Sequence, residues 1–223
     1  MKQEKNSFLQ LFDVSLTEPS GRNKLLDGIS LTINSGDRLA IVGPSGSGKT
    51  TLLRLINRLQ DPSTGSITFE SQPLTNIPVI KLRQQIVLVP QEPKLLGMTV
   101  QETLAYPLSL QQIPKPEIQQ RIEQWRSQLS IPDAWLERNE LQLSLGQRQI
   151  VSIVRGLVME PKLLLLDEPT SALDNDRAYQ LMEQLVMLSD HTTITIIMVN
   201  HQLNMVEKFT DNILRLNQGK LVQ

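Results

Sequence analysis

A glycine-rich stretch, GPSGSGKT, occupies residues 43–50 and carries the residue types that bind phosphate. It matches the pattern G-x-x-x-x-G-K-[ST], follows the apolar run RLAIV and opens the helical sequence KTTLLRLINRLQ, and these flanks favour a P-loop over a Gly/Ser surface turn. The glycines let backbone N–H groups point at phosphate oxygens, and the helix N-terminus adds about half a positive charge. The predicted phosphate-binding set is Gly43, Pro44, Ser45, Gly46, Ser47, Gly48, Lys49, Thr50 and Thr51.

Two acidic residues, Asp167 and Glu168, follow the apolar run LLLL and supply the carboxylate that a P-loop needs for its metal ion. Lys49 can reach the β- and γ-phosphates of ATP, and the Thr50 hydroxyl can bind Mg²⁺. A buried strand ending at Asp167 would bring this carboxylate beside the P-loop, because ligands of open α/β sheets bind at the carboxyl ends of the strands. We expect Asp167 to hold hydrated Mg²⁺ while Glu168 accepts a proton from an attacking water. Beside a P-loop, the alternative of two solvated acids at a strand end is disfavoured.

Two further polar residues follow apolar strands at the same predicted edge. Gln91, in VPQEP, is predicted to contact the metal and the attacking water. His201, in VNH, can hydrogen-bond the γ-phosphate, although a lone histidine at a strand end is more often structural. The other histidine, His191, is assigned to a loop without a functional role.

The stretch LSLGQRQ, residues 143–149, begins another helix. Ser144 and Gln147 have the spacing of a capping box, and apolar residues recur behind them on one helical stripe. Gly146 stands in the first turn of this helix, where glycine lowers helix stability. Either the glycine is a tolerated irregularity, or another group approaches the backbone closely there.

Composition limits the class of protein. The 223 residues allow one large domain, or a domain with a subdomain, with 39% hydrophobic and 20% charged residues. A net charge of -1 does not suggest a nucleic-acid binder, and without cysteine there are no disulfides or thiolate metal sites. Neither a secretory signal nor a membrane-spanning run is visible, so we expect a cytosolic protein whose membrane role, if any, comes through a partner.

The elements that position these residues alternate between strands and helices. Apolar runs at 38–42, 86–89, 163–166 and 193–199, separated by helices, predict a parallel sheet covered on both faces. From Thr99 to about Gly156 the chain is instead polar, Gln-rich and mostly helical, with an amphipathic helix at 116–129. The pattern is an α/β core interrupted by a helical insert.

The motifs GPSGSGKT, VPQEP, LSLGQRQ, LLLLDEPTSALD and VNH, in this order, resemble the ATP-binding subunits of ABC transporters. The chain looks most like short, stand-alone bacterial ATPase subunits, including those proposed for iron export. The resemblance implies one domain over residues 1–223. Residues 1–92 and 160–223 would form a RecA-like P-loop NTPase core with an antiparallel β subdomain, and residues 93–159 a helical subdomain with the signature motif.

The resemblance also implies roles for the site residues. Thr50, Gln91 and Asp167 would serve Mg²⁺; the catalytic set would be the general base Glu168 with Gln91 and His201. Ser144, Gly146 and Gln147 would bind the γ-phosphate of ATP held by a second subunit, and Gly146 would let that phosphate approach the backbone. The loop ending at Asp174 would cross the interface of this head-to-tail homodimer.

The dimer would drive separate integral membrane subunits from the inner face of the cell membrane, with no nucleic-acid partner. In relatives, the surface around LLGMTVQETL receives a coupling helix of the membrane subunit. Leu96, Met98 and Val100 suit that contact, and a place in the core is the alternative.

Two positions depart from the family pattern. Leu145 replaces the first glycine of the signature, and its side chain is expected to point away from the nucleotide. Glu18 stands near the place where relatives stack an aromatic residue on adenine, while Phe12, on the strand before it, is expected to face the core.

Three rival functions explain the motifs less well than a transporter subunit does. The interval between Lys49 and Ser144 has no room for the coiled coils of DNA-repair and chromosome ABC ATPases, and translation-related members usually join two ATPase domains. A non-hydrolysing nucleotide switch would not need Glu168. A small-molecule kinase would explain neither the signature nor His201. A soluble, non-transport ABC ATPase remains the alternative to a transporter subunit.

Overall fold

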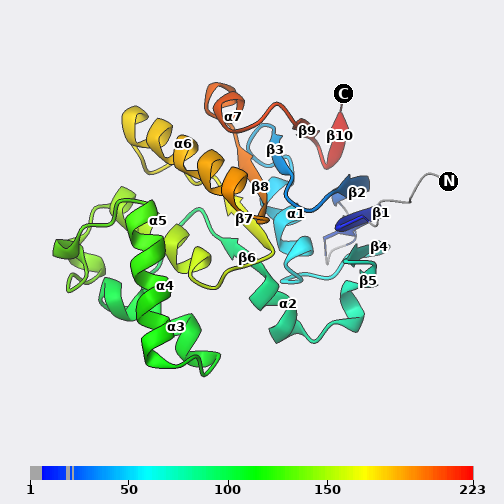
Figure 1. Ribbon diagram of the computed structural model, residues 1–223. Coiled ribbons are helices and arrows are strands. Elements are labelled where there is room, and N and C mark those ends of the chain that lie inside the picture. The colour runs from blue at the N-terminus through cyan, green and yellow to red at the C-terminus, as the bar shows by residue number, and fades with distance from the viewer. Residues whose placement is uncertain (1–6, 19–20, 22, 223) are drawn as a thin grey trace.

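The computed structural model describes residues 7–18, 21 and 23–222, and its strands form two sheets (Figure 1). The smaller sheet is antiparallel, with the order β2 (Lys24–Ile33), β1 (Leu9–Thr17), β4 (Thr64–Phe69) and β5 (Gln72–Pro73). The larger sheet has the order β10 (Lys220–Val222), β9 (Ile213–Asn217), β3 (Arg38–Val42), β8 (Thr195–Asn200), β7 (Leu163–Asp167) and β6 (Ile86–Val89). Strands β9, β3, β8, β7 and β6 run parallel, and β10 pairs antiparallel with β9.

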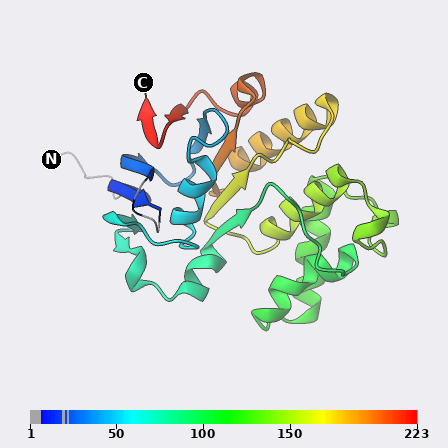
Figure 2. The same ribbon diagram turned by 180° about the vertical axis from the view of Figure 1, so that it is seen from behind.

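The described residues also form seven α-helices: α1 (Lys49–Ile56), α2 (Val79–Gln85), α3 (Val100–Leu110), α4 (Lys115–Gln128), α5 (Leu145–Leu157), α6 (Asn175–His191) and α7 (Leu203–Phe209). Short 3₁₀ turns lie at Leu74–Asn76, Asp133–Trp135 and Glu140–Gln142. Helices α3, α4 and α5 gather at one end of the molecule, and β1, β2 and β4 lie at the opposite end (Figures 1 and 2). None of the helices described is long and apolar enough to span a bilayer.

Strands β3, β6, β7 and β8 of the larger sheet are buried on both faces, because they are apolar at successive positions. In β3, Leu39 and Ile41 belong to a core shared with the smaller sheet and α1, whereas Ala40 and Val42 belong to a core shared with the helices. Side chains of successive strand residues point to opposite faces, so each strand contributes to both cores. This double covering is typical of parallel sheets and fixes the strand ends that carry the site residues.

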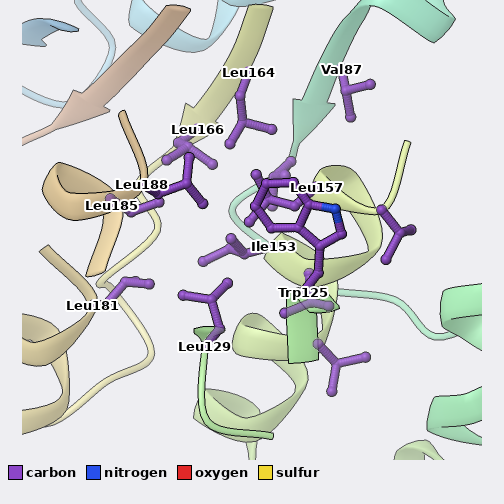
Figure 3. Close-up of a cluster of buried hydrophobic side chains, with 14 of the residues drawn as sticks. Val87, Trp125, Leu129, Ile153, Leu157, Leu164, Leu166, Leu181, Leu185 and Leu188 are labelled. Carbon is purple, nitrogen blue, oxygen red and sulfur yellow. The ribbon is translucent and has the colours of Figure 1, made fainter. Parts of the chain in front are cut away.

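The helical insert is joined to the sheet by one continuous apolar cluster (Figure 3). Trp125 of α4 and Leu157 of α5 pack into it beside Leu164 and Leu166 of β7, and Leu185 comes from α6. The division at residues 92/93 and 159/160 therefore remains a prediction about subdomains that share a core.

The predicted α/β class, with an antiparallel β portion and helices between β6 and β7, is confirmed by the two sheets and by the order of the elements. The capping box of Ser144 and Gln147 is present as predicted, with both of its hydrogen bonds.

Two local expectations were wrong. Phe12 does not face the core: its side chain is 66% exposed, because Leu9 and Leu11 take the inward positions and a bulge follows at Asp13, whose φ is 48°. His191 is not in a loop but is the last residue of α6, since Leu188 and Ser189 are still buried and hold the final turn against the core.

Candidate nucleotide-binding and hydrolysis site

The P-loop connects β3 to α1 and curls around the ammonium group of Lys49. Lys49 Nζ donates hydrogen bonds to the carbonyl oxygens of Gly43 at 2.8 Å and Pro44 at 3.0 Å, and the side chain is buried. Gly46 and Gly48 have φ values of 77° and 104°, which L side chains rarely adopt. A Cβ atom at Gly46 would meet open space, so glycine is required there by backbone conformation. The P-loop backbone is thus available to a ligand at the N-terminal end of α1.

Thr50, at the start of α1, and Asp167, at the end of β7, place two oxygen atoms side by side. Thr50 Oγ1 donates to Asp167 Oδ1 at 3.1 Å. Asp167 is only 4% exposed, and this burial raises the pKa of its carboxyl; the negative charge of Glu168 adds to the rise, and the Thr50 hydrogen bond opposes it. A buried carboxylate beside a hydroxyl is a fitting partial ligand set for Mg²⁺, which usually keeps several waters and binds few carboxylates.

The carboxylate of Glu168, the next residue, is contacted by two side chains that follow other strands. Gln91 Nε2 donates to Glu168 Oε2 at 3.3 Å, and His201 Nδ1 lies 3.1 Å from the same oxygen. The backbone of Glu168 has a φ of 47°, and its N–H donates to Val199 O at 3.0 Å. Three residues that follow β6, β7 and β8 therefore meet at one carboxylate, at the edge where parallel α/β sheets bind ligands.

The signature stretch forms the N-terminus of α5. The Gln147 N–H donates to Ser144 Oγ at 3.2 Å, and the Ser144 N–H donates to Gln147 Oε1 at 2.9 Å. Leu145 takes the first helical position with its side chain 47% exposed, and its φ is not positive, so the backbone there does not need glycine. In the part of the chain that the structure describes, no hydrogen bond joins residues 144–147 to the P-loop. One chain thus brings together the residues predicted to bind phosphate and Mg²⁺ and to act as the base.

Gly146 is in close contact with the segment between β7 and α6. A Cβ atom at Gly146 would lie 2.9 Å from the carbonyl oxygen of Ala172 and 3.0 Å from Leu173 Cδ2. The glycine therefore has a packing partner within its own chain, which the sequence did not indicate.

Sequence reasoning also missed two residues that hold the segment after Gln91. Arg155 of α5 donates to Lys94 O at 2.8 Å, and the Glu140 carboxylate accepts the Leu95 N–H at 3.2 Å. Burial lowers the pKa of the Arg155 guanidinium. An arginine inside the apolar stripe VSIVRGLV was the available signal that this side chain has a polar partner outside its helix.

A pocket of about 720 Å³ opens between the core and the helical insert. Its lining includes Gln91 and Asp167, together with the exposed side chains of Leu96, Tyr106 and Leu110. Of the other residues expected at this surface, Met98 is half-buried and Val100 is fully buried in the core.

Glu18 follows β1 and is engaged with its own turn. Its backbone N–H donates to Asn23 O at 2.9 Å, and Asn23 Nδ2 donates to Glu18 Oε2 at 3.2 Å. A carboxylate therefore stands where the family resemblance predicts an aromatic ring.

A P-loop opening α1, an aspartate ending β7 and a glutamate approached from two neighbouring strands define a P-loop nucleotide-binding protein. The sequence pattern of the ABC transporter family matches residues 26–171, and the chain belongs to this family.

Two relatives share 36% identity with the chain. The spermidine/putrescine import ATP-binding protein PotA of Haemophilus influenzae (strain ATCC 51907 / DSM 11121 / KW20 / Rd) aligns over 94% of this chain and 56% of its own length. The methionine import ATP-binding protein MetN 1 of Bacillus cereus (strain ATCC 10987 / NRS 248) aligns over 96% of this chain and 64% of its own length. The chain thus spans less than two thirds of these relatives.

Solved structures show the same fold. The cbiO1 protein from Clostridium perfringens, part of the ABC transporter complex cbiONQ, has a TM-score of 0.89 at 31% identity, covering 98% of this chain and 88% of its own. The ATP-binding cassette MJ0796, a dimer in a post-hydrolysis state bound to ADP and Pi, has a TM-score of 0.88 at 28% identity, covering 96% and 97%.

Proposed function

We propose that this chain hydrolyses ATP and uses the energy to power a membrane transporter. The observation that carries the proposal is the meeting of Gln91 and His201 at one oxygen of Glu168, directly after the metal-binding residue Asp167. The stability of the sheet alone does not require polar side chains from the ends of three strands to meet at one point.

In this proposal the P-loop backbone and Lys49 hold the triphosphate, and Glu168 accepts the proton of the attacking water. Gln91 and His201 fix the orientation of the Glu168 carboxylate, and His201, which contacts Glu168 through Nδ1, hydrogen-bonds the γ-phosphate through its other ring nitrogen when ATP is bound. Thr50, Asp167 and Gln91 would hold Mg²⁺, which would supply positive charge to the β- and γ-phosphates.

The signature of one chain acts on the nucleotide of a second chain. Ser144, Gly146 and Gln147 begin a helix, whose N-terminus favours negative charge, and they are not joined to the P-loop of their own chain. The related cassette MJ0796 was solved as a dimer bound to ADP and Pi, which supports a homodimer here. Two head-to-tail chains would bury two ATP molecules, each between one P-loop and one signature.

The membrane partner docks at the pocket between core and insert. The exposed Leu96, Tyr106 and Leu110 give it an apolar wall, and Gln91 and Asp167 connect it to the site. A segment of the membrane subunit in this pocket would sense ATP binding through the clamped Lys94–Leu95 peptide. We place the chain on the inner face of the cell membrane. The import functions in its relatives' names belong to those proteins, and the iron-export placement stays a prediction.

Lys49→Ala tests the nucleotide site. Without the ammonium group the phosphates lose their nearest positive charge, so we expect ATP affinity in a calorimetric titration to fall at least about tenfold, and hydrolysis with it. Lys81→Ala, an exposed lysine on α2, is the matched control and should behave as the unsubstituted protein. Unchanged ATP affinity in Lys49→Ala would contradict the proposal.

A further inference from the structure

The first turn of α5 packs against the loop that leads away from the proposed base. Gly146 is buried, and a Cβ atom there would lie within 3.0 Å of both Ala172 and Leu173. Real Cβ atoms essentially never approach a backbone oxygen that closely, so the two segments touch only because residue 146 is glycine.

The loop between Glu168 and Ala172 is short and internally bonded. The Ser171 N–H donates to Glu168 O at 3.1 Å, and the Leu173 N–H donates to Thr170 O at 3.0 Å. Asn200, at the end of β8, donates from Nδ2 to Thr170 Oγ1 at 2.9 Å. Two consecutive turns therefore link the base to the contact with Gly146. Because these turns are hydrogen-bonded, a displacement of Ala172 is transmitted to the backbone of Glu168.

We propose that Gly146 is a positioning residue that acts on Glu168 of its own chain through Ala172, in addition to any role toward the partner's phosphate. The inference rests on the proposed function, in which the signature and Glu168 of one chain serve two different ATP molecules. The contact then joins the two sites of the dimer within a single chain: movement of α5 at one nucleotide alters the base at the other.

The test uses a mixture in which only mixed dimers can work. One chain carries Ser144→Arg, which blocks its signature, and the other carries Lys49→Ala, which empties its P-loop. The working site then uses the P-loop and Glu168 of the Ser144→Arg chain and the signature of the Lys49→Ala chain. Gly146→Ala is added to the Ser144→Arg chain, whose own signature already serves nothing.

We expect the added Gly146→Ala to lower hydrolysis by the mixture roughly fivefold or more, since misplacing a catalytic group by about 1 Å can cost far more than that. ATP affinity should stay unchanged, because the P-loop is not touched. Leu145→Ala in the same chain is the control; its side chain is half-exposed, and hydrolysis should not change.

Unchanged hydrolysis with Gly146→Ala in the Ser144→Arg chain, together with loss when it is moved to the Lys49→Ala chain, would overturn the inference and leave the proposed function standing. A mixture inactive without Gly146→Ala would overturn both. If the Gly146→Ala chain does not fold, Leu173→Ala in its place loosens the same contact without adding atoms. A smaller loss of hydrolysis then supports the inference, and no loss overturns it.

Discussion

The carboxylate of Glu168 is held from two sides before any nucleotide is considered. Gln91 and His201 both contact the same oxygen, Oε2. A base fixed in this way loses little freedom when the attacking water arrives, which is how positioning lowers a reaction barrier.

Glu168→Gln keeps the shape of this residue and removes its basicity. We expect turnover to fall at least about tenfold, within the range that general-base catalysis contributes, while ATP binding persists. The variant should accumulate as an ATP-bound dimer, seen by gel filtration with ATP. Glu183→Gln, an exposed position on α6, is the control and should hydrolyse ATP normally. Hydrolysis at the parental rate in Glu168→Gln would remove Glu168 from the mechanism.

Base selectivity should be weak, because Glu18 offers no aromatic face. Stacking on an aromatic side chain is worth about 1–3 kcal/mol per base in nucleic-acid binders. We therefore expect GTP to be hydrolysed within a few-fold of ATP in steady-state assays. Glu18→Tyr should favour tighter binding of both nucleotides. A strong preference for ATP in the unsubstituted protein would mean that another residue recognises adenine.

Among the elements, α5 combines two features at its N-terminus: a capping box that exposes Ser144 and a glycine that lets the Ala172 loop approach. The capping box could be predicted from sequence because its partners are three residues apart. The Ala172 contact could not, since it joins residues far apart in the chain and leaves no periodic pattern.

The difference between local patterns and long-range contacts also explains which other features could be predicted from the sequence. Strands β3, β6 and β7 and their terminal site residues were predictable because a buried parallel strand is an unbroken apolar run. The bulge at Asp13, which shifts the alternation between Leu11 and Val14 and leaves Phe12 on the outward face, has no such pattern. The Arg155 contact with Lys94 depends likewise on how α5 lies against a distant loop.

Gly146→Ala gives a measurement on α5 that needs no nucleotide. Alanine in a helix is normally more stable than glycine by up to about 1 kcal/mol. Here the added methyl group meets a backbone oxygen, and overpacking costs about 1–3 kcal/mol. We expect the urea midpoint of the nucleotide-free protein to fall, and Leu173→Ala to relieve part of that additional loss in a double-mutant cycle. A raised midpoint would show that the space beside Gly146 is open.

At the scale of the whole molecule, one chain brings together the proposed phosphate, metal and base residues, and its proposed signature lies at the N-terminus of α5. In a head-to-tail dimer each nucleotide would meet both, the first set from one chain and the signature from the other. The helical insert shares a core with the sheet, so closing the dimer would also move the walls of the 720 Å³ pocket. This is the proposed path from ATP to the membrane subunit.

The most direct test of the shared site is ATP hydrolysis by a mixture of Ser144→Arg and Lys49→Ala. Each variant alone should be inactive, the first because an arginine blocks the partner's γ-phosphate and the second because its P-loop binds ATP poorly. Ser144→Arg alone should still bind ATP as a monomer in a calorimetric titration. Mixed, the two should recover hydrolysis, since the intact P-loop of one chain meets the intact signature of the other. Normal hydrolysis by monomeric Ser144→Arg, or a mixture as inactive as its parts, would contradict the account.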